Sequence, residues 1–158
     1  MESQALTKRL NLSFEARFGL VSAILERARA FMRDADQGEH YGILVVVREL
    51  VENAIVHGNR SDPTKLVKLA IRLCAPGLFE VQVEDEGQGF DYAEVVARLP
   101  GGANGEERSG YLLIHELADK VAFENHGSKV RVLARTDGAR NSGSRDPKVP
   151  LRPEEERI

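Results

Sequence analysis

The 158-residue chain lacks several features that mark specialised classes of protein. A single cysteine, Cys74, excludes an intramolecular disulfide and a cysteine-cluster metal site. No apolar run approaches the roughly 20 residues of a membrane-spanning helix, and the first residues contain no apolar signal-peptide segment. Basic residues are not in excess, since the net charge is −3, which argues against binding to nucleic-acid phosphates. We therefore expect a cytoplasmic protein that acts at neither nucleic acid nor membrane.

The composition, 42% hydrophobic and 30% charged, is that of one globular α/β domain. Residues 5–12 alternate loosely and predict a short strand. From Ser13, as a helix N-cap, the spacing predicts a first helix. A second helix is predicted over about 40–57, with Gly58 in a left-handed conformation after its last turn. The apolar stripes of the two helices are Phe14, Phe18, Val21, Leu25, Ala28 and Met32, and Ile43, Val47, Leu50, Val51, Ala54 and Ile55.

The second half of the chain is mostly strand-like. Residues 65–74 and 78–85 alternate around Pro76-Gly77 and predict an antiparallel hairpin. Residues 120–135 predict a second hairpin, after a glycine-rich loop over 86–109, typical of a lid, and a helix over about 109–119. Residues 136–158 hold too few apolar side chains to offset their ordering entropy. We expect one domain over 1–135 and a disordered tail over 136–158.

The first motif is RELVENAIVHGN, residues 48–59. Glu49, Asn53 and His57 are four residues apart and share one helical stripe. A glutamate there could accept a proton from a hydroxyl group or water, and an asparagine oxygen is a hard ligand suited to Mg²⁺. The alternative is the solvated face of an amphipathic helix.

The second motif is VEDEGQGFD, residues 83–91. Asp85 follows a strand, and its carboxylate could accept a hydrogen bond from the exocyclic amine of adenine. Gly87 and Gly89 permit a positive φ and the close approach of a flat ligand. The alternative is an ordinary glycine-rich turn, because two glycines at this spacing are a weak signal.

The third motif covers residues 101–121, where a glycine-bearing loop leads into a helix. Free N–H groups at a helix start near Ser109 and Gly110 could bind an anion. Arg108 could add a charge-assisted contact to a phosphate or a partner carboxylate. The alternative is an ordinary loop with Ser109 as the N-cap.

The order of these motifs resembles that of the GHKL ATPase superfamily, which includes sensor histidine kinases, gyrase B subunits and MutL-type proteins. ELVENAIVHGN resembles the N-box of bacterial anti-sigma factor serine/threonine kinases of the RsbW and SpoIIAB type. VEDEGQGFD resembles their next box, and SGYLLIHELADKVAFENHGSKVRV resembles their last helix and hairpin. The resemblance covers about residues 5–135. It implies a Bergerat fold, an α+β two-layer sandwich of a mixed, mostly antiparallel sheet with helices on one face.

The resemblance also implies where ATP and Mg²⁺ bind. Asn53 matches the Mg²⁺-binding asparagine, and Glu49 matches the general base. Asp85 matches the aspartate that reads adenine, with Gly87 and Gly89 as its glycines.

Two further positions complete the site that the resemblance implies. Ser128 matches a hydroxyl residue that supports adenine through water. Arg108-Ser109-Gly110 replaces the usual Gly-x-Gly of the last box, so a side chain stands where the backbone would wrap the phosphates. This departure bears on catalysis more than on nucleotide binding.

Kinases of this type phosphorylate a serine on a STAS-domain anti-anti-sigma protein, or hold a sigma factor inactive, usually as homodimers. Two alternatives stay open. Because of Arg108, the chain could be a catalytically inactive module that switches partners with the nucleotide. It could also be a detached histidine-kinase ATP-binding domain that acts on a separate protein.

Overall fold

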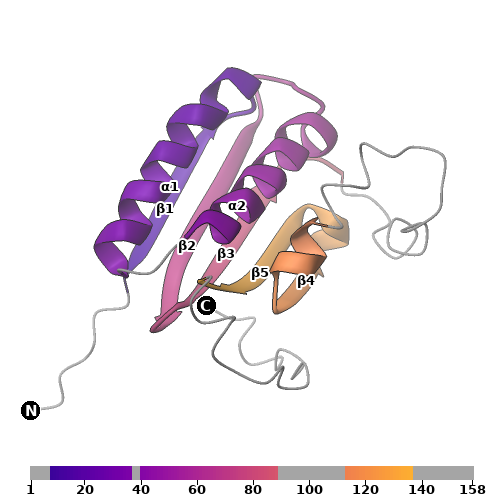
Figure 1. Ribbon diagram of the computed structural model, residues 1–158. Helices are drawn as coiled ribbons and strands as arrows, with labels where there is room; N and C mark the ends of the chain where they lie inside the picture. Colours follow the sequence, from indigo (N-terminus) through magenta and orange to yellow (C-terminus); the bar gives the residue numbers. More distant parts are fainter. Residues whose placement is uncertain (1–7, 37–39, 89–112, 137–158) are drawn as a thin grey trace, which may run out of the picture.

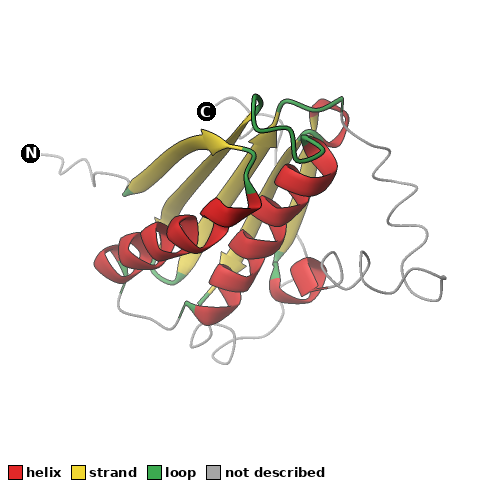
Figure 2. Cartoon of the chain, turned by 90° about the horizontal axis from the view of Figure 1, so that it is seen from above, coloured by secondary structure: helices red, strands yellow, loops and turns green. Residues whose placement is uncertain are grey.

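A computed structural model describes residues 8–36, 40–88 and 113–136, and these form two layers (Figure 1). Helices α1 (Val21–Ala35) and α2 (Tyr41–Asn53) lie side by side on one face of a five-stranded sheet, as Figure 2 shows from above. The expected α+β architecture, with its helices on one face, is confirmed. No helix in these three ranges is long and apolar enough to cross a bilayer.

The sheet has the strand order β1-β2-β3-β5-β4. Its strands are β1 (Arg9–Glu15), β2 (Leu66–Ala75), β3 (Leu78–Asp85), β4 (Lys120–Glu124) and β5 (Lys129–Arg135). The four neighbouring pairs within the described residues are all antiparallel, in agreement with the mostly antiparallel sheet that the resemblance implies. Both predicted hairpins, β2–β3 and β4–β5, are confirmed.

The core lies between the helices and the sheet. Alternate residues of β3, namely Phe79, Val81 and Val83, face the helices and are at most 2% exposed. The whole predicted stripe of the second helix is buried against them. Burying such side chains stabilises the fold by about 1.5–3 kcal/mol each. This packing fixes α2 over β3, the two elements that carry the first two motifs.

The prediction for the start of the first helix was wrong. Ser13 lies in β1 and pairs with Lys68, while Phe18–Leu20 forms a 3₁₀ turn before α1 begins at Val21. The apolar residues of β1 alternate with period two, so this segment adds an edge strand that packs Phe14 against the core.

The end of α2 also differs from the prediction. The helix continues beyond Asn53 as a π-helical turn, η2 (Ala54–Gly58). Gly58 belongs to this turn, and the left-handed residues are instead Arg60 and Ser61, with φ of 51° and 55°. Single π-turns inside helices are frequent at functional sites.

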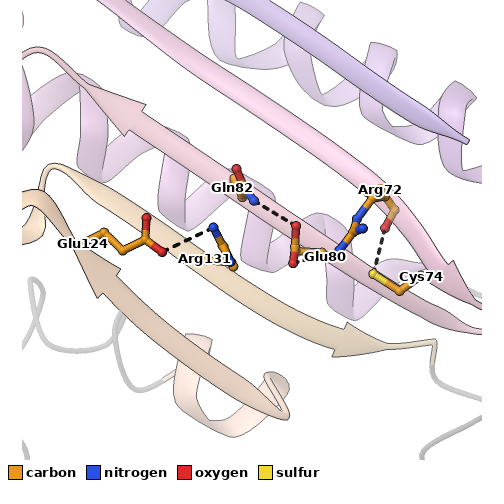
Figure 3. Close-up of polar contacts among 6 residues, drawn as sticks. All are labelled: Arg72, Cys74, Glu80, Gln82, Glu124 and Arg131. Carbon is orange, nitrogen blue, oxygen red and sulfur yellow. Dashed lines mark hydrogen bonds and ion pairs between the residues drawn. The ribbon is translucent and has the colours of Figure 1, made fainter. Parts of the chain in front are cut away.

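The sheet face opposite the helices carries two buried charges, both paired (Figure 3). Glu80 of β3 is 7% exposed; its carboxylate lies 3.3 Å from Arg72 and accepts a hydrogen bond of 2.9 Å from Gln82. Arg131 of β5 is 1% exposed and lies 3.3 Å from Glu124 of β4. A buried charge requires such a partner. The alternating pattern predicts that this face of the sheet is exposed to solvent, whereas these two charged side chains are buried in it.

Candidate functional site

Helix α2 carries the first two candidate side chains. Glu49 and Asn53 are one turn apart and both partly buried, next to the buried Leu50 and Val51. The Glu49 side chain is only 15% exposed, and its carboxylate lies 3.5 Å from Arg48. The two polar groups therefore border the core, unlike the side chains of a fully solvated helix face.

The carboxamide of Asn53 presents an unpaired polar atom. Its Nδ2 is buried and has no hydrogen-bond partner among the described residues. Leaving such a group unpaired costs about 1–3 kcal/mol, which a bound ligand would recover. Because the oxygen and nitrogen of a carboxamide are assigned from their surroundings, the same position can present an oxygen to a cation. Asn53 therefore fits the expected Mg²⁺ ligand.

Glu52 lies beside these residues and is less solvated than a surface charge. Burial raises the pKa of Glu52, and the nearby Glu49 raises it further, whereas Arg48 lowers it. Arg48 lies 3.9 Å from the Glu52 carboxylate, so its guanidinium group pairs with both Glu49 and Glu52. His57 is exposed, because the π-turn changes the helical period after Asn53.

Asp85 ends β3 and is held on two sides. Its Oδ1 accepts a hydrogen bond of 2.8 Å from the N–H of Gly87, and its own N–H donates to the carbonyl of Ser128 at 2.9 Å. Burial raises the pKa of Asp85, against the lowering effect of the Gly87 N–H. The structure thus brings Ser128 next to Asp85. The Ser128 hydroxyl donates to the carbonyl of Asn125 at 2.9 Å.

Two glycines permit the close contact between the π-turn η2, which follows α2, and Asp85. A β-carbon at Gly58 would overlap the Asp85 carboxylate, and one at Gly87 would overlap the Gly58 carbonyl. Gly87 is not among the residues with positive φ, so close approach rather than backbone conformation explains it. The sequence pattern predicts only that Gly58 ends the helix, and it does not predict this contact with Asp85.

Asn59 is a second residue that the sequence did not single out. It is fully buried, and its carboxamide bonds to the backbone of Leu66 and of Glu86, at the ends of β2 and β3. The only signal in the sequence that could have identified Asn59 is that it is a polar residue directly after a glycine. Gly89 of the predicted adenine-reading motif and the predicted phosphate-binding residues Arg108, Ser109 and Gly110 lie outside the described residues.

The arrangement can hold a flat, amine-bearing ring and a hydrated cation. Asp85 presents a half-buried acceptor beside two glycines, and a carboxylate can only accept hydrogen bonds when it is ionised. Glu49 and Asn53 project from the helix whose end contacts Asp85.

Comparisons with known proteins agree with this geometry. A family model described as "Histidine kinase-like ATPase domain" matches residues 14–134. An anti-sigma F factor of Heyndrickxia coagulans is 30% identical over 126 residues, which cover 76% of this chain and 85% of the relative. An anti-sigma F factor of Geobacillus kaustophilus is 31% identical over 125 residues, with the same coverage of 76% and 85%.

A solved structure shares the fold. The crystal structure of the RsbU and RsbW domains of a Mycobacterium tuberculosis protein superposes with a TM-score of 0.55 at 16% identity. The match covers 81% of this chain and 31% of that longer chain. The chain therefore belongs to the GHKL family of histidine kinase-like ATPase domains, in the group of the bacterial anti-sigma factors.

Proposed function

We propose that this chain is an anti-sigma factor that uses Mg²⁺ and ATP to phosphorylate a serine or threonine on a STAS-domain anti-anti-sigma protein. In its other state it holds a sigma factor inactive. The observation that carries the proposal is the contact of the Asp85 carboxylate with Gly58, at the end of the helix that bears Glu49 and Asn53. The likeness to anti-sigma F factors over 85% of their length supports the regulatory role.

Asp85 is proposed to select adenine. Its Oδ1 is engaged by the Gly87 N–H, which leaves Oδ2, on the side of Gly58, as the acceptor for the exocyclic amine. Partial burial strengthens such a hydrogen bond because water competes less for it. Ser128 lies beside Asp85 and is proposed to support the base through water.

Glu49 and Asn53 are proposed to act at the phosphate end. Mg–ATP supplies the transferable phosphoryl group together with the cation that neutralises its charge. Asn53 holds the cation through its carboxamide oxygen. Glu49 accepts the proton of the partner's hydroxyl group, and its place at the edge of the core holds it in one position.

The remaining assignments complete the proposal. Gly89, together with Gly87, allows the close approach of the adenine ring. Arg108, Ser109 and Gly110 contact the phosphates, with Arg108 as the cation that replaces the usual glycine. The domain over 1–135 carries this site, and the tail over 136–158 is outside it. The protein acts in the cytoplasm as a homodimer, and it contacts neither DNA nor membrane itself.

The test is affinity capture from the native cell, with and without Mg–ATP, followed by phosphoryl transfer to the captured proteins. We expect a sigma factor in one state, a STAS-domain protein in the other, and acid-stable phosphate on that STAS-domain protein. Nucleotide-dependent capture without any transfer would instead identify a partner-switching module. Acid-labile phosphate on a partner histidine would identify a detached histidine-kinase domain.

A further inference from the structure

The buried Asn59 side chain connects three segments around the candidate base-binding residue. Its Nδ2 donates to the carbonyl of Leu66 at 2.9 Å, and its Oδ1 accepts from the N–H of Glu86 at 2.8 Å. The N–H of Leu66 in turn donates to the Glu86 carboxylate at 2.9 Å. Asn59, Leu66 and Glu86 thus form a closed circuit of three hydrogen bonds.

The circuit lies where the pairing of β2 with β3 ends. The last backbone pair is Val67 with Asp85, so Leu66 and Glu86 would be the next pair of the ladder. The Asn59 carboxamide instead donates to one strand and accepts from the other, as a peptide unit of an intervening strand would. It therefore holds the two strand ends apart and sets the direction in which the chain leaves β3 after Asp85.

The backbone of Asn59 is fixed as well. Its N–H donates to the carbonyl of Ala54 at 2.8 Å, and its carbonyl accepts from Asp62 at 3.0 Å. It directly follows Gly58, whose backbone touches the Asp85 carboxylate. The fully buried Asn59 is thus linked to both partners of that contact. It is bonded to Gly58 along the chain, and its hydrogen bond to the N–H of Glu86 holds the residue that follows Asp85.

We propose that Asn59 is a positioning residue that fixes the Asp85 carboxylate for selection of the nucleotide base. This inference rests on the proposed function of Asp85. Guanine presents a carbonyl oxygen where adenine presents an amine. A carboxylate in a fixed position therefore accepts a hydrogen bond from the base of ATP and repels the carbonyl oxygen of GTP. A carboxylate that can rotate away discriminates less between the two nucleotides. The phosphates are bound elsewhere and do not depend on Asn59.

The test is calorimetric titration of the full chain with Mg–ATP, Mg–GTP and Mg–tripolyphosphate. For Asn59→Ala we expect the ATP-over-GTP preference to fall about tenfold or more, with tripolyphosphate affinity unchanged within error. Asn59→Asp keeps the volume and the acceptor for Glu86 but sets an oxygen against the Leu66 carbonyl, so it should lose the same preference. Asn11→Ala, at an exposed side chain of β1, is the matched control. A lowered melting temperature with the preference intact would overturn the inference.

A second readout does not need nucleotide. The Gly87 amide donates to Asp85 Oδ1, so its hydrogen exchange reports whether the carboxylate is in place. Asn59→Ala should accelerate exchange at Gly87 more than at the core amides of β3. Unchanged relative protection of Gly87 would overturn the positioning role even if ATP binds. Failure of the wild-type chain to bind ATP would instead overturn the proposed function, while this measurement still decides whether Asn59 positions Asp85.

Discussion

The carboxylate of Asp85 lies directly against the backbone of Gly58, with no space for a β-carbon between them. The contact joins the end of β3 to the π-turn that follows α2, so Asp85 is held next to the helix that carries Glu49 and Asn53. Gly58→Ala must displace the carboxylate, since neither backbone can move without disturbing the Asn59 circuit.

We therefore expect Gly58→Ala and Asp85→Ala each to weaken ATP binding by about tenfold or more. The double variant should bind no worse than Asp85→Ala alone, because both changes remove the same interaction. Gly19→Ala is the matched control, since a β-carbon there meets nothing within 4 Å. Additive losses in the titration cycle would contradict the coupling.

The pH dependence of stability should reveal the partial burial of Asp85. Its pKa is raised above the ordinary value of 3.8, so the folded chain binds more protons than the unfolded chain between 3.8 and the raised value. Stability therefore falls as pH rises through that window, and the loss persists above it. Without nucleotide, Asp85→Asn should melt higher than wild type near neutral pH, and the difference should vanish below 3.8.

Asp62 provides the opposite case as a control. Hydrogen bonds from the side chain and backbone of Thr64 lower the pKa of Asp62 below 3.8. Its contribution to stability is present above that value and is lost as pH falls through the lowered pKa. Asp62→Asn should therefore melt lower than wild type at neutral pH. Thermal melts that show the same sign for Asp62→Asn and Asp85→Asn would contradict both assignments.

Substitutions of Glu49 and Asn53 in α2 should affect phosphoryl transfer and ATP binding differently. Glu49→Gln should lower phosphoryl transfer to the STAS-domain partner by about 100-fold or more, because the general base is lost, while ATP affinity stays unchanged. Asn53→Ala should weaken both Mg–ATP binding and transfer. Glu52→Gln, beside Glu49 and paired with the same Arg48, should keep most of the activity. Equal transfer by wild type and Glu49→Gln would refute the mechanism.

The parts of the fold that follow a strict period could be predicted. The stripe of α2 and the alternation of β2, β3 and β5 each have one face that must be buried, so the pattern determines the element. Residues 13–18 could not be assigned in this way. Phe14 and Phe18 fit a helical spacing, and only the pairing of β1 with β2 decides that Phe14 belongs to a strand.

The candidate site residues that the sequence singled out are those with distinctive chemistry at a distinctive place in the pattern. A carboxylate after a strand and an asparagine one turn from a glutamate stand out in the sequence, as Asp85, Asn53 and Glu49 do. Asn59 and Gly58 act through contacts with residues more than 25 positions away, such as Glu86 and Asp85. No local pattern encodes such a contact, and a π-turn has no sequence signature that separates it from a helix end.

The segment after the π-turn carries backbone strain that a glycine should relieve. Arg60 is exposed and has a φ of 51°, a conformation that costs a residue with a side chain about 1–2 kcal/mol. Arg60→Gly removes that cost but loses more chain entropy on folding, which leaves a net gain of up to about 1 kcal/mol. We expect its melting temperature to rise by about 2–4 °C. Arg60→Ala removes the same side chain but keeps the strain, so it should melt close to wild type; if Arg60→Gly melts no higher than Arg60→Ala, the left-handed conformation carries no strain.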